Sequence, residues 1–298
     1  MHRHSQRSGR RRGGWRVYCG LLFLASSGLS NPLPASASDD ALTIINDTWS
    51  HYRSVKTERE ESEILIVRSP HAARYSRAEA EELLGDTKPG VVHKRAVRHT
   101  LYAADGLDKI HIVFSLPAED AGLSMLVWRQ AESARDSMWL FMPGYPTVRR
   151  IPVSSRQRLA GTDLLYEDVR ELSGERTAGF SYATRPPETV DGHPCEVIVA
   201  TPKSGTSSAY GSRTIWIGKE LHIPLKVEFH AVNGKLWKVL YNTELHEVAP
   251  AVQRADLIEM RDLQADETTL LLVTKRAVGG DIPSQVFTED YLAHPADD

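Results

Sequence analysis

Three carboxylates, Asp163, Glu167 and Asp168, form the densest group of side chains that could do acid–base or metal chemistry in this chain. Positions four and five apart on a helix place two carboxylates on neighbouring faces, close enough to share a proton or a cation. The same acids also suit a structural role, because Asp163 can cap a helix N-terminus and the helix dipole favours acidic residues in the first turn. We expect the capping role, with no catalytic residue and no metal site here.

Hydrolysis of an acyl ester is a second chemistry to consider, and it would need a serine beside a histidine. Ser154 and Ser155 are the candidate serines, because the partners of a catalytic triad need only be close in space, not in sequence. The chain contains no G-x-S-x-G, H-E-x-x-H, phosphate-loop or dinucleotide-binding motif. An acyl-ester hydrolase therefore remains an alternative, and no cofactor is predicted.

The chain has twelve histidines, which raises the question of a metal site. No two of them have the H-x-x-x-H spacing that would pair them on a helix. His93 with His99, and His222 with His230, share a strand face but lie ~20 Å or more apart at the rise of an extended strand. The histidines therefore predict no metal site.

Residues 1–37 have the features of a secretory leader. Six arginines and no acidic residue come first, an apolar run from Val17 to Leu29 follows, and Ala35-Ser36-Ala37 supplies an A-x-A cleavage site. The apolar run has 13 residues, whereas a membrane-spanning helix needs roughly 20. We predict cleavage after Ala37 and a periplasmic mature chain, residues 38–298, that forms a single domain.

The predicted mature chain is acidic. The leader holds six of the 36 basic residues, so 261 residues would remain with 30 basic against 39 acidic side chains, a net charge of −9. An acidic surface repels nucleic acid, so we predict no nucleic-acid partner. Arg149 and Arg150 could bind an anion, but a solvated pair on an edge strand is the more common role. Cys195 would be the one remaining cysteine, and we expect it to be a small buried side chain.

Most of the chain alternates short apolar runs with turns at a spacing of 8 to 12 residues, which is typical of antiparallel sheet. Apolar residues at steps of three and four predict a helix at residues 41–55, and Ser76-x-x-Glu79 is a capping box that opens a short helix ending at Gly85. We predict strands at residues 63–68, 91–101, 107–116, 122–128, 137–142, 147–151, 175–183, 195–201, 212–218, 223–231, 235–246, 255–262 and 267–276. The fold class is mainly β, one large curled antiparallel sheet with a few helices.

The predicted strand at residues 137–142 has two apolar faces. Trp139 and Phe141 lie on one face of its two-residue period, and Leu140 and Met142 lie on the other. We therefore expect other parts of the chain to cover this strand on both sides.

This strand also begins the stretch by which the chain resembles a known family. Its W-x-F-x-P pattern, the triplet Arg149-Arg150-Ile151 and the series GTDLLYEDV at residues 161–169 resemble the LolA-like outer membrane lipoprotein-sorting protein family. Residues 112–128, 209–229, 233–240 and 286–292 extend the resemblance. The chain departs from the family at residues 159–164, where a Met-Gly-Ser-Asp-Phe series is usual, and at residues 71–90, which resemble an insertion.

The resemblance implies a half-open β-barrel whose hydrophobic cavity is covered by helices, here residues 41–55 and 163–172. It implies a carrier or sensor that binds acyl chains of a lipid or lipoprotein, with an RND-type inner-membrane exporter as a partner. On this basis the candidate cavity residues are Trp128, Trp139, Phe141, Phe180, Tyr182, Trp216, Phe229 and Trp237, and the candidate lid residues are Trp49, Asp163, Glu167 and Asp168. A structural envelope protein with a filled barrel remains the other alternative.

Overall fold

The computed structural model describes residues 36–68, 73–85, 88–130, 135–171 and 174–294. The predicted leader, residues 1–37, lies outside the described residues except for its last two positions. Within the described ranges no helix is long and apolar enough to cross a membrane.

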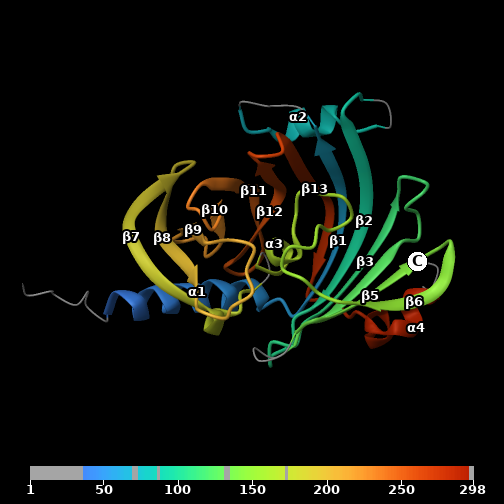
Figure 1. The fold of residues 1–298 in the computed structure, drawn as a ribbon, viewed down its shortest axis with the longest axis horizontal. Helices are drawn as coiled ribbons and strands as arrows, with labels where there is room; N and C mark the ends of the chain where they lie inside the picture. Colours follow the sequence, from blue (N-terminus) through green and yellow to red (C-terminus); the bar gives the residue numbers. More distant parts are fainter. Residues whose placement is uncertain (1–35, 69–72, 86–87, 131–134, 172–173, 295–298) are drawn as a thin grey trace, which may run out of the picture. The chain divides into compact units, whose positions relative to one another are not determined.

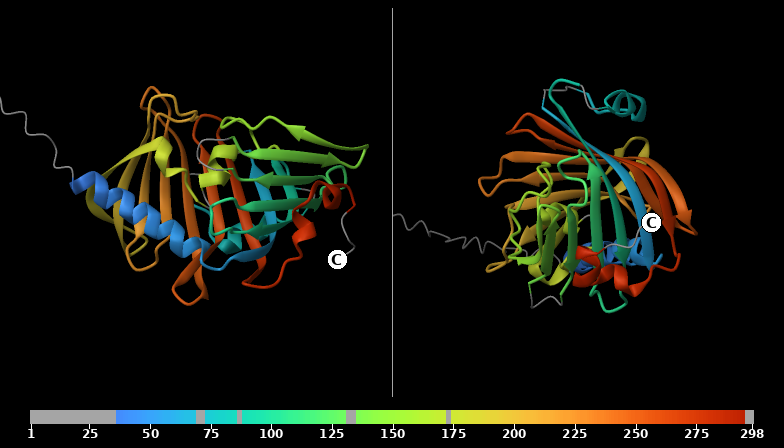
Figure 2. Two further views of the ribbon diagram at one scale, coloured as in Figure 1. Left: turned by 90° about the horizontal axis from the view of Figure 1, so that it is seen from below. Right: turned by 90° about the vertical axis from the view of Figure 1, so that its right-hand side faces the viewer.

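A single antiparallel sheet dominates the described residues (Figure 1). Its strands are β1 Thr57–Val67, β2 Val91–Leu101, β3 Lys109–Leu116, β4 Ser124–Trp128, β5 Ser137–Met142, β6 Tyr145–Ile151, β7 Phe180–Val190, β8 His193–Pro202, β9 Ser212–Gly218, β10 Pro224–His230, β11 Leu236–Ala249, β12 Val252–Asp262 and β13 Glu267–Val278. They lie in the order β6-β5-β4-β3-β2-β1-β13-β12-β11-β10-β9-β8-β7. The sheet is strongly curved and does not close, because β6 and β7 remain as edges (Figure 2).

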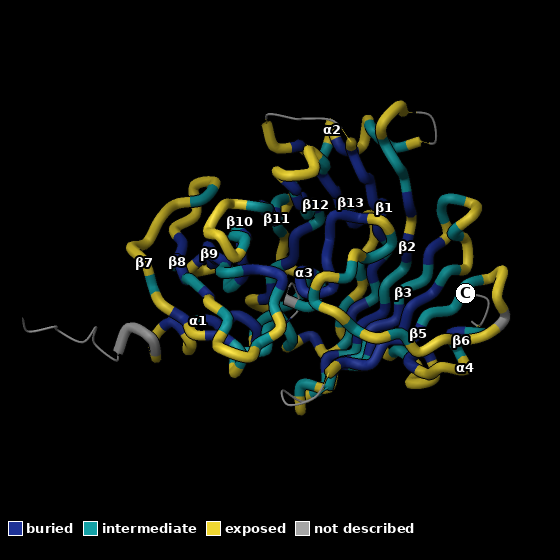
Figure 3. The backbone as a smooth tube through the Cα atoms, in the orientation of Figure 1, coloured by how far each residue is buried: buried dark blue, intermediate teal, exposed yellow. Residues whose placement is uncertain are grey.

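The helices are short apart from the first, as expected for a mainly β chain. They are α1 Ser36–Arg53, α2 Arg77–Glu82, α3 Tyr166–Glu171 and α4 Glu289–Ala293, with 3-10 turns at Thr177–Gly179 and Ser284–Phe287. Helix α1 packs along the concave side of β7 to β12, where Ile45 and Trp49 join the largest apolar cluster. Burial is deepest in the middle of the sheet and least along the two edge strands, β6 and β7 (Figure 3).

The two apolar faces of β5 are both covered, as its alternating pattern predicts. Met138 and Leu140 face the concave side, where they pack with residues of β3, β4 and the segment before and within α3. Trp139 and Phe141 face the convex side, where Phe287 and Leu292 pack on them. We call residues 282–292 the C-terminal segment. The C-terminal segment is therefore the outer cover of this half of the sheet.

The connection between the two edge strands determines what covers the concave side. Strands β6 and β7 are consecutive in sequence but lie at opposite edges of the sheet. Residues 152–179, which we call the bridging segment, must therefore pass across the open side, and α3 lies on this path (Figure 1). Residues 172–173 of the segment lie outside the described residues. The bridging segment and α1 together cover the concave side.

The predicted strands agree with the structure except at two places. Strand β1 begins at Thr57, six residues before the predicted strand, because Glu58 and Glu60 face inward and are paired there with arginines. The strand predicted at residues 175–183 is instead a 3-10 turn followed by β7, which continues to Val190 through Pro186 and Pro187. Prolines are tolerated there because β7 is an edge strand and its register shifts at that point.

The segment that resembles an insertion contains the predicted short helix. Ser76 and Glu79 form the capping box at the start of α2. Tyr75 and Ala80 pack on Leu65 and other apolar side chains of β1, β12 and β13, on the convex side. Cys195 is also buried, in a separate apolar cluster with Val197 and Trp216, as the sequence indicates.

The packing of the C-terminal segment can be tested at Phe287, whose side chain is fully buried against β4 and β5. Phe287→Ala should lower the free energy of unfolding by about 3 to 5 kcal/mol, because it leaves a cavity beside Trp139. Tyr145→Ala is the control, since Tyr145 is 58 % exposed and its loss should change stability by about 0.5 kcal/mol or less. Equal effects of the two substitutions in urea unfolding would show that the segment does not anchor the sheet.

Candidate functional site

A cavity of about 130 Å³ lies between the concave face of the sheet, the C-terminal half of α1 and the bridging segment. Strands β1 to β4 and β10 to β13 supply its walls, Trp49 and Tyr52 come from α1, and Leu159 and Leu164 come from the bridging segment. Sites for drug-sized ligands usually measure about 300 to 1,000 Å³. In this form the cavity is therefore too small for a whole acyl chain.

The cavity has one apolar end and one charged end. Along β1 the inward side chains change from Glu58 and Glu60 to Ser62 and Ile64. Along β2 they change from Arg98 to Ala96, two residues away on the same face. The apolar end is a cluster of Ile64, Ala96, Phe114, Met125 and, packed against it, Leu271. The wall of the cavity is therefore polar at one end and apolar at the other.

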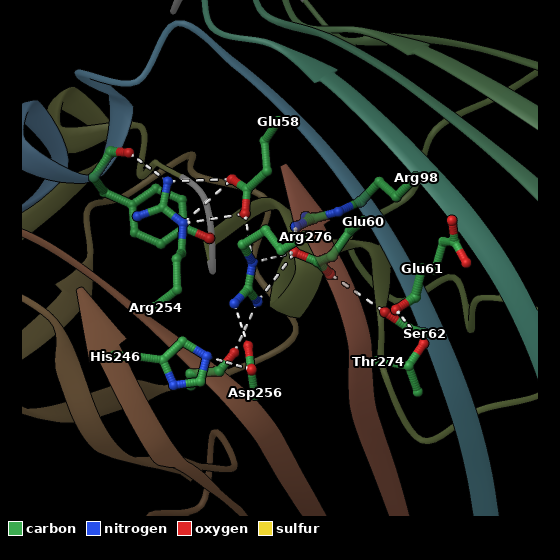
Figure 4. Close-up of polar contacts among 12 residues, drawn as sticks. Glu58, Glu60, Glu61, Ser62, Arg98, His246, Arg254, Asp256, Thr274 and Arg276 are labelled. Atoms are coloured by element: carbon green, nitrogen blue, oxygen red, sulfur yellow. Dashed lines mark hydrogen bonds and ion pairs between the residues drawn. The ribbon is translucent and has the colours of Figure 1, made fainter. Parts of the chain in front are cut away.

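The charged end is a network of ion pairs between four strands (Figure 4). Arg254 Nε of β12 donates to both carboxylate oxygens of Glu58 at 3.2 Å, and Tyr102 Oη donates to the same carboxylate at 2.9 Å. Arg276 Nε of β13 lies 3.0 Å from Glu58 Oε1 and 3.3 Å from Glu60 Oε2. Arg98 Nη2 of β2 donates to Glu60 Oε2 at 2.7 Å.

Burial and charge act in opposite directions on Glu58. Removal of the carboxylate from water would raise its pKa, but the charges of Arg254, Arg98 and Arg276, together with the hydrogen bond from Arg254, lower the pKa to about 2. Glu58 is therefore ionised at neutral pH although it is 1 % exposed. The network holds charge inside the curved sheet because each carboxylate has cationic partners.

A second polar network holds the bridging segment against the sheet. Lys238 of β11 is fully buried, and its Nζ donates to the backbone oxygen of Asp163 and to Asp168 Oδ2. Tyr210 Oη donates to Asp168 Oδ1 at 2.7 Å, and the backbone nitrogen of Ala209 donates to Glu167 Oε2 at 2.6 Å. Glu167 and Asp168 therefore have a structural role, because their hydrogen bonds hold the bridging segment against the sheet.

The capping role predicted for Asp163 is wrong. Helix α3 begins at Tyr166, three residues later, and Asp168 rather than Asp163 accepts a hydrogen bond from the backbone nitrogen of Leu165. The carboxylate of Asp163 instead lies 3.5 Å from Arg158 Nη1 and accepts from Thr269 Oγ1 at 3.4 Å. The contacts of Asp163 with Thr269 hold its side chain against β13, so it does not cap α3.

The environment of Asp163 disfavours its charge. Burial is the largest cause, Glu267 and Asp262 add negative charge, and Arg158 opposes them, so the pKa of Asp163 rises to about 7. Arg158 lies within 4 Å of all three carboxylates. The proton on Asp163 is therefore gained near neutral pH, at the point where the bridging segment contacts β13.

The eight aromatic candidates lie elsewhere than along this cavity. Trp128, Trp139, Phe141 and Trp216 are on the convex side, the first three under the C-terminal segment and Trp216 in the cluster of Cys195. The period of two correctly grouped Trp139 with Phe141, but the inward face of β5 is that of Met138 and Leu140. The expectation that these four wall the cavity is corrected accordingly.

The other four aromatics, Phe180, Tyr182, Phe229 and Trp237, are on the concave side but pack under α1 in the filled half of the sheet. Trp49 is the candidate that lines the cavity. Sequence reasoning missed the charged residues of the cavity, because partners such as Glu60 and Arg276 are 216 positions apart. Residues 57–63 are all polar, so no alternation of polar and apolar residues indicates that a strand begins at residue 57.

The serines of the hydrolase alternative line a separate groove of about 800 Å³. Ser155 Oγ lies 3.4 Å from Ser207 Oγ, and Ser154 Oγ accepts from the backbone nitrogen of Arg156 at 3.4 Å. The described residues that line this groove include no histidine, so it does not assemble a serine–histidine pair.

Arg149 and Arg150 are exposed on edge strand β6. Arg150 Nη2 donates to Ser137 Oγ at 2.7 Å, and Arg149 lies over the Tyr145 ring. No cluster of three potential metal ligands occurs among the described residues.

The raised pKa of Asp163 predicts a pH dependence of stability. Its folded-state pKa of about 7 exceeds its ordinary value of 3.8, so the folded state binds a proton before the unfolded state does, and stability from this group rises as the pH falls from about 7 to about 4. In Asp163→Asn that rise should be absent. Urea unfolding of both proteins at several pH values measures the difference, and identical profiles would contradict the assignment.

A protein-family model matches more than half of the chain. The model of a protein family described as "Uncharacterized protein" matches residues 106–294. No curated protein has significant sequence similarity to this chain.

Solved structures extend the similarity over most of the chain. An outer membrane lipoprotein-sorting protein domain from Vibrio parahaemolyticus has a TM-score of 0.73 at 19 % identity, covering 86 % of this chain and 99 % of its own. A DUF1329 family protein from Desulfovibrio piger has a TM-score of 0.68 at 20 % identity, covering 83 % and 98 %. The LolA superfamily protein NE2245 from Nitrosomonas europaea has a TM-score of 0.59 at 20 % identity, covering 84 % and 98 %. The fold is therefore LolA-like, as the sequence indicates.

Proposed function

This chain belongs to the family described as "Uncharacterized protein" and has a LolA-like fold, and we propose that it is a carrier that takes up an acyl chain of a lipid or lipoprotein. The observation that supports this most directly is the apolar end of the cavity, formed by Ile64, Ala96, Phe114 and Met125. Each CH₂ group buried against such a wall contributes about 0.8 kcal/mol and needs no directional contact.

The small volume of the cavity sets a condition on uptake. At about 130 Å³, it has to widen before a long chain can enter. The part of the wall best suited to move is the bridging segment, because Leu159 and Leu164 contact the cavity through side chains while polar contacts with Lys238 and Thr269 hold the segment in place. We infer that loading separates residues 158–165 from the sheet and unloading restores these contacts.

The proposed lid consists of the bridging segment and the C-terminal half of α1. Trp49 forms part of the cavity wall, and Glu167 and Asp168 hold the bridging segment closed. Asp163 contributes the contact with Arg158, which is 48 % exposed at its side chain. This pair lies where the segment first meets β13 and is the point at which opening would begin.

The carrier would act in the bacterial periplasm, which the predicted leader at residues 1–37 would allow the chain to reach. Sorting of lipids or lipoproteins toward the outer membrane is the process that fits this location and fold. An RND-type exporter as its partner stays a prediction from the family resemblance.

A substitution that fills the apolar end tests the proposal. Ala96 is 5 % exposed and lines the cavity, so Ala96→Leu should reduce binding of a fluorescent fatty acid at least tenfold while changing the free energy of unfolding by about 1.5 kcal/mol or less. Val97→Leu is the matched control, because Val97 is the next residue on β2 and points to the opposite face.

Two results would contradict the carrier proposal. The first is a wild-type protein that binds no acyl chain. The second is an Ala96→Leu protein that is folded and binds as tightly as the wild type and as Val97→Leu, since the acyl chain would then lie outside this cavity.

A further inference from the structure

The three arginines at the charged end of the cavity differ in how many contacts they make. Arg254 donates to Glu58, to the backbone oxygens of Gln253 and Tyr52, and lies 3.5 Å above the Tyr52 ring. Arg276 contacts Glu58, Glu60, Asp256 and the backbone oxygen of Ala255. All three nitrogens of each guanidinium are therefore engaged.

Arg98 has a different arrangement. Among the described residues its one hydrogen-bond partner is Glu60, through Nη2. Its side chain is 21 % exposed, compared with 2 % for Arg254 and 7 % for Arg276, and it lines the cavity. A guanidinium carries five N–H donors in a planar fork that fits a carboxylate or phosphate. Arg98 therefore presents unused donors to the cavity.

A second donor on the cavity wall lacks a partner within the described part of the chain. Trp49 is 8 % exposed and lines the cavity, and its Nε1 makes no hydrogen bond there. Trp49 packs edge-on against Tyr52, with ring centroids 5.8 Å apart, and Tyr52 lies under Arg254 in the same charged network. A buried N–H without a partner costs free energy, and an acceptor on a ligand would satisfy it.

From these observations we propose that the cavity selects an amphiphile with an anionic head, a carboxylate or a phosphate, which Arg98 binds while the tail lies along Ala96 toward Phe114 and Met125. This deepens the proposed carrier function and rests on it. Ala96 is two residues from Arg98 on the same face of β2, about 7 Å along the strand, so the head and the first methylenes reach the two ends at once. The carboxylate of Glu60 does not repel the anionic head, because Arg276 also pairs with Glu60 and balances its negative charge.

Chain-matched ligands separate the contribution of the head from that of the tail. Decanoate, decyl phosphate and decan-1-ol have the same tail and differ in the head. Calorimetric titration of the purified full mature chain with each ligand therefore compares the heads directly. Wild type should bind at least one of the two anions about tenfold to a hundredfold more tightly than the alcohol, the range expected for a hydrogen bond to a charged group. The anion that binds more tightly identifies a fatty acid or a phosphorylated lipid as the source.

The variant that tests the residue is Arg98→Gln. It should remove most of the preference for the anions and leave the affinity for decan-1-ol within about twofold. Arg98→Lys should retain part of the preference, because the charge remains while the planar fork is lost. Arg95→Gln is the matched control, since Arg95 lies on the other face of β2, is 49 % exposed at its side chain and pairs with Glu63. Arg95→Gln should bind all three ligands like the wild type.

The outcomes distinguish this inference from the function on which it rests. Equal binding of the anions and the alcohol to wild type, or an equal loss of all three in a folded Arg98→Gln protein, would overturn the anionic-head proposal and leave the carrier intact. Binding of none of the three by wild type would overturn the carrier and this inference with it. Thermal unfolding of Arg98→Gln confirms that the variant is folded, as expected because Glu60 keeps Arg276 as its partner.

Discussion

The ion pairs of Glu58 and Glu60 with three arginines are the interaction on which the rest of the structure depends. They join β1 to β2, β12 and β13 at the centre of the sheet, and Arg254 also binds the last turn of α1 through the backbone oxygen of Tyr52. A buried ion pair adds little stability relative to an apolar pair of equal size, but loss of one partner is costly, about 3 to 5 kcal/mol. The network therefore fixes register and position more than it adds stability.

The ion-pair network determines both the register of β1 in the sheet and the polarity of the cavity wall. A shift of β1 by one residue would turn Glu58 and Glu60 to the convex side and leave the inward arginines without partners. With the register fixed, the inward row of β1 runs from charged to apolar, and the neighbouring strands repeat that order. The bridging segment has to cross this face because it joins the two edges of the sheet. A cavity with unlike ends follows from these two facts.

The sequence predicts most of the strands, and in β5 it also predicts which residues share a face, but it does not predict which face is concave. Alternation in Met138 to Met142 predicts that Trp139 and Phe141 share a face, and they do. The period of two does not indicate which face is concave. The prediction places the aromatic pair in the cavity, whereas in the structure it packs under Phe287. The C-terminal segment that covers Trp139 and Phe141 is more than 140 residues away in sequence, and no local sequence pattern predicts that contact.

The charged site was harder to predict for a related reason. Every residue from 57 to 63 is polar, so the sequence alone indicates a surface segment there, and only the partners on β2, β12 and β13 show that Glu58 and Glu60 are buried. Local rules did identify features that local contacts determine, such as the capping box of Ser76 and Glu79. Asp163 shows the limit of those rules, because Thr269 and Arg158, both outside α3, determine where its carboxylate lies.

Native mass spectrometry of the protein, isolated from the periplasm without detergent, tests the central claim most directly. The account predicts a noncovalent adduct with the mass of one acyl amphiphile, released on activation as a free anion. A protein that carries no adduct, and gains none after incubation with an acyl anion, would contradict the claim that the curved sheet encloses a binding site for such a molecule.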